Sequence, residues 1–385
     1  MAPIPWYRDA QGTVWLDDAW HRDLLAHLDY IDDLTVLAPQ APLPDPMPDN
    51  LRKIEDAPGL RFIDLPSGGS TGRALLRVPA TLAAVWRAVR RADIVHSGAA
   101  GWPLPPGLFV NPAAVLLRKP LVIVIESAFW RLTGPGPHGP LRRLRAGMTE
   151  ALARWSIRRA RLTVLTHEGY RDSLARGVPG RVMVIPASWI DADAVVPEAM
   201  AQTRREGPAR LLLAARLTPE KGIASALEAA ERAGPGLSLT VIGEGPLREQ
   251  VAAAAERLGP ERLRLLDPVP YGPSFFDLIR DHDAVLVPTL SDEQPRILFD
   301  AFSQGRPALA SDTEGNREAA QEGETAWLFA PGDVDALTRL FDRAAVDPSG
   351  LRAMGPAARA LALRHTHQRM HYARAETLAE LFGKR

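Results

Sequence analysis

Two cations follow a predicted buried strand in the second half of the chain. Residues 211–215 are an apolar run, and Arg216 and Lys221 flank the short turn that leads into a predicted helix. Arginine can bind phosphate oxygens through two parallel hydrogen bonds, and lysine adds a point charge. The free N–H groups and dipole of a helix N-terminus also favour anions. The pattern is compatible with a phosphate site, but taken alone a solvated surface pair is the slightly better explanation.

Two further turns contain glycine and follow predicted strands. Gly243 and Gly245 open one predicted helix, and Gly315 and Asn316 lie at the start of another. Glycine lets a backbone approach a ligand closely, and N–H groups at a helix start can reach a diphosphate. Each turn alone is equally well explained as an ordinary strand-to-helix connection with an N-cap.

Three acids lie in and after a polar loop near residue 290. Asp292 and Glu293 are in the loop, and Asp300 is in the helix predicted to follow it. Asp292 and Asp300 are eight residues apart, roughly two helical turns. Carboxylates suit sugar hydroxyls because they accept several hydrogen bonds. One acid could hold a hexose and the other a ribose, but for any single acid helix capping or plain exposure is the better explanation.

Short apolar, β-branched runs alternate with segments of helical spacing along most of the chain. Such runs suit strands that are buried on both faces of a parallel sheet. The alternation predicts an α/β fold with two doubly wound, Rossmann-like parallel-sheet domains that face a central cleft, the expected ligand site. The predicted strands are residues 34–38, 60–65, 93–96, 121–126, 162–167, 181–186, 210–215, 237–243, 263–266, 284–288 and 307–311.

The length of 385 residues also favours two domains. Residues 187–208 contain no convincing strand, so we place a linker there. The predicted organisation is an N-terminal domain over 1–190, a linker over 191–208, a second domain over 209–360 and a C-terminal helical segment over 361–385 that crosses back to the first domain.

Bulk composition excludes several classes of function. The 46 basic residues balance the 46 acidic ones, so no overall charge favours nucleic acid. The chain has no cysteine, which excludes disulfides, thiolate zinc sites and a cysteine nucleophile. No signal-like segment or long apolar run is visible. We therefore expect a cytoplasmic protein, with peripheral attachment to the inner face of a membrane left open.

The cation pair at 216–221, the glycine turn at 243–245, the acids at 292–300 and the turn at 315–316 occur in an order and spacing that resemble a known family. They resemble retaining GT-B glycosyltransferases of family 4, the glycosyl transferases group 1. The resemblance covers roughly residues 210–328 and, less clearly, the whole chain. In that family an R-x4-K-G sequence after a strand binds the donor diphosphate, and Arg216, Lys221 and Gly222 match it. A G-x-G-P turn matches Gly243 and Gly245.

The acids depart from the family pattern. The family's E-x7-E motif is similar to Asp292 and Asp300, with aspartate in place of both glutamates. The resemblance implies that the first acid contacts the transferred sugar and the second the ribose. Glu293 competes with Asp292 for the sugar role. The turn at Gly315 and Asn316 is similar to the family's phosphate turn.

The resemblance implies a metal-independent, retaining transfer of a hexose from a UDP- or GDP-sugar, the donor substrate, with no cofactor. The acceptor would be a glycan, a lipid-linked molecule or a small molecule, bound by the N-terminal domain. The second domain would bind the donor. A nucleotide-sugar epimerase and a catalytically silent module that binds nucleotide sugar or glycan are the alternatives. The sugar, base, linkage and oligomeric state stay open.

The N-terminal half offers four acceptor-side candidates. The strand at 121–125 ends in Glu126, where many family members have a polar group close to the anomeric centre, and a local cap is the alternative. Trp130 and Arg131 follow it and could stack on or grip an acceptor sugar. His96 ends another strand, and a satisfied structural histidine is favoured over a ligand contact.

Two other segments have open interpretations. Residues 141–161 have apolar residues at helical spacing among seven arginines and one acid, Glu150. A basic amphipathic helix can lie on anionic lipid, but a helix that packs its apolar stripe on the sheet is favoured. Residues 361–381 predict one helix with His365, His367 and His371, which we interpret as structural rather than metal-binding.

Overall fold

The computed structural model describes residues 6–48, 50–65, 71–99, 101, 104–132, 138–201 and 207–383. These residues form two compact units. Unit 1 contains the described residues up to 132, residues 138–185 and residues 371–383. Unit 2 contains described residues 186–370. Part of the predicted linker, residues 202–206, lies outside the described residues.

Unit 2 is built on a six-stranded sheet in which every strand pair is parallel. The strand order is β13-β12-β11-β14-β15-β16. The first five strands were predicted from their apolar runs, whereas β16 was missed because four apolar residues show no distinctive period. The strands are β11 (Ala209–Ala214), β12 (Leu237–Ile242), β13 (Leu263–Leu266), β14 (Ala284–Val287), β15 (Ala308–Ser311) and β16 (Ala326–Phe329).

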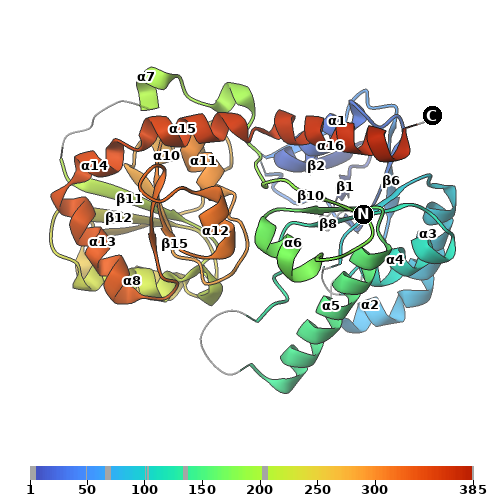
Figure 1. Cartoon of the computed structure of the whole chain (residues 1–385), viewed down its shortest axis with the longest axis horizontal. Helices are drawn as coiled ribbons and strands as arrows, with labels where there is room; N and C mark the ends of the chain where they lie inside the picture. The colour runs from blue at the N-terminus through green and yellow to red at the C-terminus, as the bar shows by residue number, and fades with distance from the viewer. Residues whose placement is uncertain are drawn as a thin grey trace. The chain divides into compact units, whose positions relative to one another are not determined.

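Both faces of this sheet are largely buried, which explains why its strands are mostly apolar. Leu211 and Leu213 of β11 belong to one core cluster, with helices α8 and α13 packed over it. Leu212 points to the other cluster, which α11 and α15 cover (Figure 1). The helical segments of unit 2 are η1 (Ala192–Ala194), α7 (Glu198–Ala201), η2 (Pro219–Lys221), α8 (Ile223–Arg232), α9 (Arg248–Leu258), α10 (Pro273–Arg280), α11 (Ile297–Ser303), α12 (Glu314–Ala319), α13 (Val334–Val346), α14 (Pro348–Arg352) and α15 (Gly355–Arg364).

Unit 1 has a four-stranded parallel sheet with the order β10-β9-β8-β7 and a separate parallel pair, β3 with β6. Leu37 of β3 shares a core cluster with Val95 of β7, so the two sheets pack into one hydrophobic interior. The predicted α/β class with parallel sheets is therefore confirmed in both units. The strands are β3 (Leu34–Ala38), β6 (Leu60–Asp64), β7 (Val95–Ser97), β8 (Leu121–Ile125), β9 (Leu162–Leu165) and β10 (Arg181–Val184).

A small mixed sheet at the start of unit 1 was not predicted. Strands β1 (Trp6–Arg8), β2 (Val14–Asp17), β4 (Gln40–Ala41) and β5 (Leu51–Lys53) have the order β4-β1-β2-β5. The strands are only two to four residues long, too short to show a clear alternation. Trp6 anchors the sheet: it is 2% exposed, and its indole Nε1 donates to the carbonyl oxygen of Ala38 at 2.9 Å.

The helices of unit 1 cover its sheets (Figure 1). Among the described residues of the chain, the helices lack a stretch of the length and apolarity that crossing a bilayer requires. The helices of unit 1 are α1 (Asp18–Leu28), α2 (Thr71–Leu76), α3 (Val78–Arg91), α4 (Gly107–Leu116), α5 (Pro140–Arg159) and α6 (Glu168–Leu174).

The C-terminal segment is two helices rather than the single one predicted. Helix α15 ends at Arg364 and α16 (His367–Phe382) begins after a break at His365 and Thr366. Thr366 caps α16, because its hydroxyl accepts from the Arg369 N–H at 3.4 Å. From His371 onward, α16 belongs to unit 1, where its last turns pack against strands β8 and β9.

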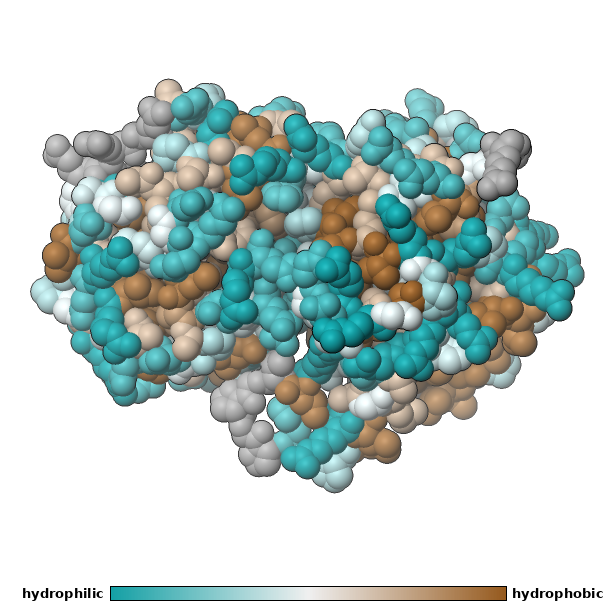
Figure 2. All heavy atoms as spheres, in the orientation of Figure 1, coloured by the Kyte–Doolittle hydropathy of each residue, from teal (hydrophilic) through white to brown (hydrophobic). Residues whose placement is uncertain are grey.

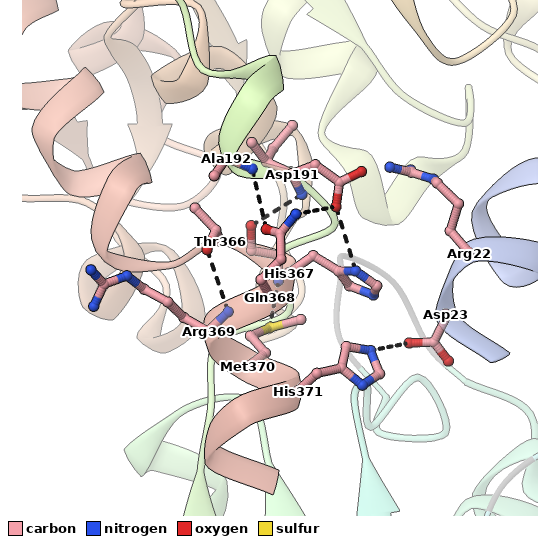
Figure 3. Close-up of polar contacts among 12 residues, drawn as sticks. Arg22, Asp23, Asp191, Ala192, Thr366, His367, Gln368, Arg369, Met370 and His371 are labelled. Carbon is pink, nitrogen blue, oxygen red and sulfur yellow. Dashed lines mark hydrogen bonds and ion pairs between the residues drawn. The ribbon is translucent and has the colours of Figure 1, made fainter. Parts of the chain in front are cut away.

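The two histidines at the start of α16 each have a carboxylate neighbour in their own unit (Figure 3). In unit 2, His367 Nδ1 lies 3.6 Å from Asp191 Oδ1. In unit 1, His371 Nε2 lies 3.2 Å from Asp23 Oδ1, and its Nδ1 is 3.0 Å from the Tyr30 hydroxyl. Each buried imidazole therefore has a polar partner.

The buried position of Trp6 generates a stability prediction. Trp6→Ala removes a buried ring and a hydrogen bond, and should cost about 3–5 kcal/mol in the free energy of unfolding. Trp86 on α3 is 45% exposed, so Trp86→Ala is the matched control and should change stability by roughly 0.5 kcal/mol or less. Urea unfolding followed by circular dichroism measures both, and equal effects would contradict the anchoring role of Trp6.

Candidate active site

The candidate site lies where the strand order of unit 2 reverses. From β11 the chain proceeds outward to β12 and β13, then returns to the other side of β11 as β14 and continues to β15 and β16. The connections that follow β11 and β14 thus lead to opposite faces of the sheet, to α8 and α11. In doubly wound sheets, ligands bind at this reversal, at the carboxyl ends of the strands.

The connection after β11 carries the two predicted phosphate-binding cations. Arg216 is exposed, and Lys221 is the last residue of the short turn η2, two residues before α8 begins. Gly222 joins η2 to α8 with φ +70°, and a Cβ added there would lie 1.9 Å from the Pro288 carbonyl oxygen. Only glycine fits, because the backbone is left-handed and the β14 connection is in direct contact.

Lys221 forms an ion pair with Glu293, a residue of the β14 connection. The side chains are 15% and 18% exposed, respectively. Burial, and then repulsion from Arg216, lower the pKa of Lys221 to about 8, while Glu220 acts in the opposite direction. The carboxylate of Glu293 favours the ammonium form, so it compensates in part for the burial of this charge.

Backbone hydrogen bonds hold the β11 and β14 connections together. The carbonyl oxygen of Glu220 accepts from the Leu290 N–H at 2.8 Å and from the Thr289 hydroxyl at 3.1 Å. Thr289 Oγ1 is also 3.0 Å from the Ser291 hydroxyl. The carboxylate of Asp292, next in the chain, is half-buried and has no polar partner among the described residues. Asp292 is therefore available to a ligand.

The predicted turn at Gly315 and Asn316 packs against this connection. A Cβ on Gly315 would lie 2.7 Å from the Asp292 carbonyl oxygen, so the start of α12 touches the acidic loop. The Asn316 N–H is capped by Thr313, and its side-chain amide donates to the Ser311 carbonyl oxygen at 2.8 Å. Asn316 is fully buried and braces the turn, and Gly315 is buried against the backbone of the acidic loop.

Asp292 lies in the loop and Asp300 in the helix that follows, as predicted. Helix α11 begins at Ile297, so the eight-residue spacing between the two acids is not two turns of one helix. Asp300 is buried in the first turn of α11, and its carboxylate accepts from the Tyr271 hydroxyl at 2.8 Å. Sequence reasoning missed Tyr271, whose only signal is its position shortly after β13.

The glycine turn after β12 is braced in the same way. The Gly243 carbonyl oxygen accepts from Arg248 at 2.9 Å, and Arg248 also contacts Asp267 at 2.5 Å. The Leu217 N–H donates to the Glu244 carbonyl oxygen at 2.8 Å, which links this turn to the β11 connection. Gly245 is the next residue of the turn. Connections from β11, β12, β14 and β15 therefore converge on one end of the sheet.

The acceptor-side candidates are all in unit 1. Glu126 is exposed directly after β8, and its carbonyl oxygen accepts from the Thr166 hydroxyl at 3.2 Å. His96 lies in β7, with its ring centroid 6.2 Å from that of His27. Burial is the main cause that lowers the pKa of His96 well below its usual value, so the ring is neutral near pH 7. This environment fits the structural role that the sequence favoured.

Trp130 and Arg131 both contact other residues of unit 1. Trp130 is 7% exposed, and its Nε1 donates to Glu150 at 2.8 Å. Arg131 forms an ion pair with Glu150 at 3.1 Å and also bonds the Ser173 hydroxyl. Burial tends to raise the pKa of Glu150, but the Arg131 and Trp130 hydrogen bonds outweigh it and lower the pKa. Both residues therefore brace α5, and a contact of either with an acceptor sugar stays a prediction.

Two family descriptions match adjoining parts of the chain. Residues 20–188 match the glycosyl transferase 4-like domain, and residues 196–361 match the glycosyl transferases group 1. A curated relative, the 2-deoxystreptamine N-acetyl-D-glucosaminyltransferase of Streptomyces fradiae, is 29% identical over 71% of this chain and 68% of its own length.

Solved structures share the fold. HepE from Anabaena, in complex with UDP and glucose, superposes with a TM-score of 0.66, at 18% identity over 98% of this chain and 100% of its own. Sucrose-phosphate synthase from Thermosynechococcus elongatus superposes with a TM-score of 0.73, at 17% identity over 99% of this chain and 96% of its own. Both likenesses concern the two-domain GT-B architecture.

The contact at Gly222 generates a prediction for the stability of unit 2. In Gly222→Ala the new Cβ displaces the Pro288 carbonyl, and alanine is also strained in the left-handed backbone conformation. Gly323, also in unit 2, has φ +74° with open space around its Cα, so Gly323→Ala carries only the conformational cost, about 1–2 kcal/mol. We expect Gly222→Ala to be clearly the more destabilising in urea unfolding. Similar losses for both variants would show that the contact with Pro288 does not constrain the site.

Proposed function

The chain belongs to the group 1 glycosyltransferases and has the GT-B fold, and on that premise we propose that it moves a hexose from a nucleoside diphosphate sugar with retention of anomeric configuration. Unit 2 is the proposed donor-binding unit and unit 1 the proposed acceptor-binding unit. The observation that carries the proposal is the position of Arg216 and Lys221 at the strand reversal of unit 2, beside an acidic loop.

In the proposed transfer, the acceptor hydroxyl oxygen bonds to the anomeric carbon on the face from which the diphosphate leaves. The bond between that carbon and the diphosphate oxygen breaks, and the hydroxyl proton passes to a phosphate oxygen. Negative charge grows on the leaving diphosphate, where Arg216 and Lys221 stabilise it as preorganised cations. No metal ion is needed in this scheme.

Other residues of unit 2 have proposed positioning roles. Asp292 has a carboxylate without a polar partner among the described residues, and it would accept hydrogen bonds from the hexose hydroxyls. Asp300, held by Tyr271, would contact the ribose. Gly243, Gly245 and the start of α12 would let backbone N–H groups approach the diphosphate.

The donor is proposed to be a UDP-sugar. This choice is supported by the UDP and glucose that the HepE structure contains, and by the family's nucleotide-sugar chemistry. The acceptor is proposed to be a glycan, a lipid-linked molecule or a small molecule, the last in line with the aminocyclitol named for the Streptomyces fradiae relative. Glu126, exposed after β8, is the proposed group that orients the acceptor hydroxyl.

Glu293 has a proposed role as the counter-ion of Lys221 before the donor binds. A diphosphate that binds Lys221 would compete with the Glu293 carboxylate for the same ammonium group and is proposed to displace it. The released Glu293 then lies beside Asp292, where it can contact the sugar. Glu293 therefore weakens donor affinity while keeping the buried lysine charged in the free protein.

Product analysis tests the reaction. The purified chain is incubated with UDP-glucose or UDP-N-acetylglucosamine and a panel of sugar and aminocyclitol acceptors, and proton NMR reports the anomeric configuration of the product. We expect an α-linked product from an α-linked donor, with a rate that EDTA does not reduce. An inverted product, interconversion of the donor sugar without an acceptor, or donor binding without turnover would each contradict the proposal.

The ammonium of Lys221 should control donor affinity. Lys221→Ala should weaken UDP binding roughly ten- to hundredfold, the loss expected for one charged hydrogen bond of about 1.5–3 kcal/mol. Because the pKa of Lys221 is lowered to about 8 in the free protein, the charged form is lost as the pH rises through this value. UDP affinity should therefore fall above about pH 8 in calorimetric titrations.

Three variants serve as controls for this prediction. Lys221→Arg should remove the fall with pH, because a guanidinium stays protonated. Glu293→Gln should tighten UDP binding because it removes the competing carboxylate. Lys119→Ala, in unit 1, should leave the affinity unchanged. If Lys221→Ala leaves UDP affinity unchanged, Lys221 does not bind the diphosphate. If Glu293→Gln weakens UDP binding, Glu293 is not a competing counter-ion.

A further inference from the structure

Helix α5 presents an apolar stripe to solvent over its N-terminal half. Leu141, Leu144 and Met148 are 77%, 60% and 65% exposed. They follow the i, i+3, i+7 spacing, which places them on one face of the helix. Figure 1 shows this half of α5 extending past the neighbouring helices of unit 1, and Figure 2 shows apolar and hydrophilic spheres together at that end.

A different face of α5 packs on unit 1. The residues that α5 buries are Thr149, Ala153, Ser156 and Ile157, of which Ala153 and Ile157 belong to the core of the unit. This corrects the favoured expectation from the sequence, in which the apolar stripe would pack on the sheet. The stripe at 141–148 is therefore not needed to hold α5 in place, since the second half of the helix does so.

The same half of α5 is strongly basic. Arg142, Arg143 and Arg145 are exposed and lie between the apolar residues, and the first acid of the helix is Glu150. Among the described residues, Arg142 and Arg143 have no acidic partner. Glu150 itself is engaged by Arg131 and Arg154. The net charge of residues 140–149 is thus +3, from three arginines and no acid.

We propose that the N-terminal half of α5 is a docking surface for an anionic lipid bilayer. Leucine and methionine side chains on one face would enter the boundary between headgroups and acyl chains, while long arginine side chains beside them reach the phosphates. Anionic lipid attracts basic segments by about 1 kcal/mol per arginine near the surface. The positive charge of this half of α5 complements the negative charge of the bilayer. It also disfavours contact with a second copy of α5, because two segments of charge +3 repel each other.

The inference stands apart from the donor site, because α5 belongs to unit 1 and the donor residues to unit 2. Bilayer docking would concentrate the enzyme at a two-dimensional surface and favour acceptors that are anchored there. It would also be weakened by salt, since exposed charges are screened within about 8–10 Å at physiological ionic strength.

Liposome co-sedimentation of the whole chain tests the proposal. We expect binding to vesicles of phosphatidylcholine with phosphatidylglycerol, and little binding to phosphatidylcholine alone. Replacing Arg142, Arg143 and Arg145 with glutamine should weaken binding on the order of 100-fold, from three arginines at about 1 kcal/mol each. Leu141→Ser, Leu144→Ser and Met148→Ser together should also abolish sedimentation, although they leave the charge unchanged.

A matched control changes an exposed apolar residue and an exposed arginine on α13 of unit 2. Val346→Ser with Arg339→Gln should sediment like the wild-type chain. Thermal melts establish that each variant is folded, and unchanged UDP binding separates this result from failure of the donor site. Absent binding to anionic vesicles, or binding that the α5 variants do not alter, overturns the proposal. Self-association that the serine variants abolish would instead assign the stripe to a second copy.

Discussion

Strands β11 and β14 pair at the centre of unit 2, yet the segments that follow them lead to opposite faces of the sheet. Backbone groups at these strand ends would be unpaired if the two connections separated freely, and buried unpaired groups are costly. The Glu220 carbonyl oxygen meets this constraint by accepting from Leu290 and Thr289. Main-chain hydrogen bonds thus position the charged residues of the candidate site, together with the ion pair between Lys221 and Glu293.

Buried hydroxyls and an amide extend this support to β15. The Ser311 hydroxyl donates to the Thr289 carbonyl oxygen at 2.5 Å, and Asn316 donates to Ser311 from the start of α12. Such a network costs little reorganisation when charge develops on a ligand, which is the condition for electrostatic stabilisation of a transition state. Lys221 forms its ion pair with Glu293 beside this framework.

The sequence predicted those parts of the molecule whose signal is local. Continuous apolar runs identified strands β11 to β15, and the position of Lys221 before a helix was visible from its neighbours. Contacts between distant residues were not visible. Trp130 and Arg131 looked accessible because nothing in their neighbourhood revealed Glu150, which lies about twenty residues later on α5. The pairing of Lys221 with Glu293 spans 72 positions and was equally hidden.

Because of helix α16, unit 1 is built from separate segments of the chain, whereas the described part of unit 2 is built from one. Unit 2 is continuous in sequence over 186–370 among the described residues, whereas unit 1 is completed by residues 371–383, whose Leu378, Leu381 and Phe382 pack on β8 and β9. A gene fragment that stops after β10 would encode a sheet with one apolar face bare. If related genes exchanged unit 2, both hydrophobic cores would be preserved only when the whole segment 186–370 was replaced. Such an exchange needs two crossover points, one on each side of that segment.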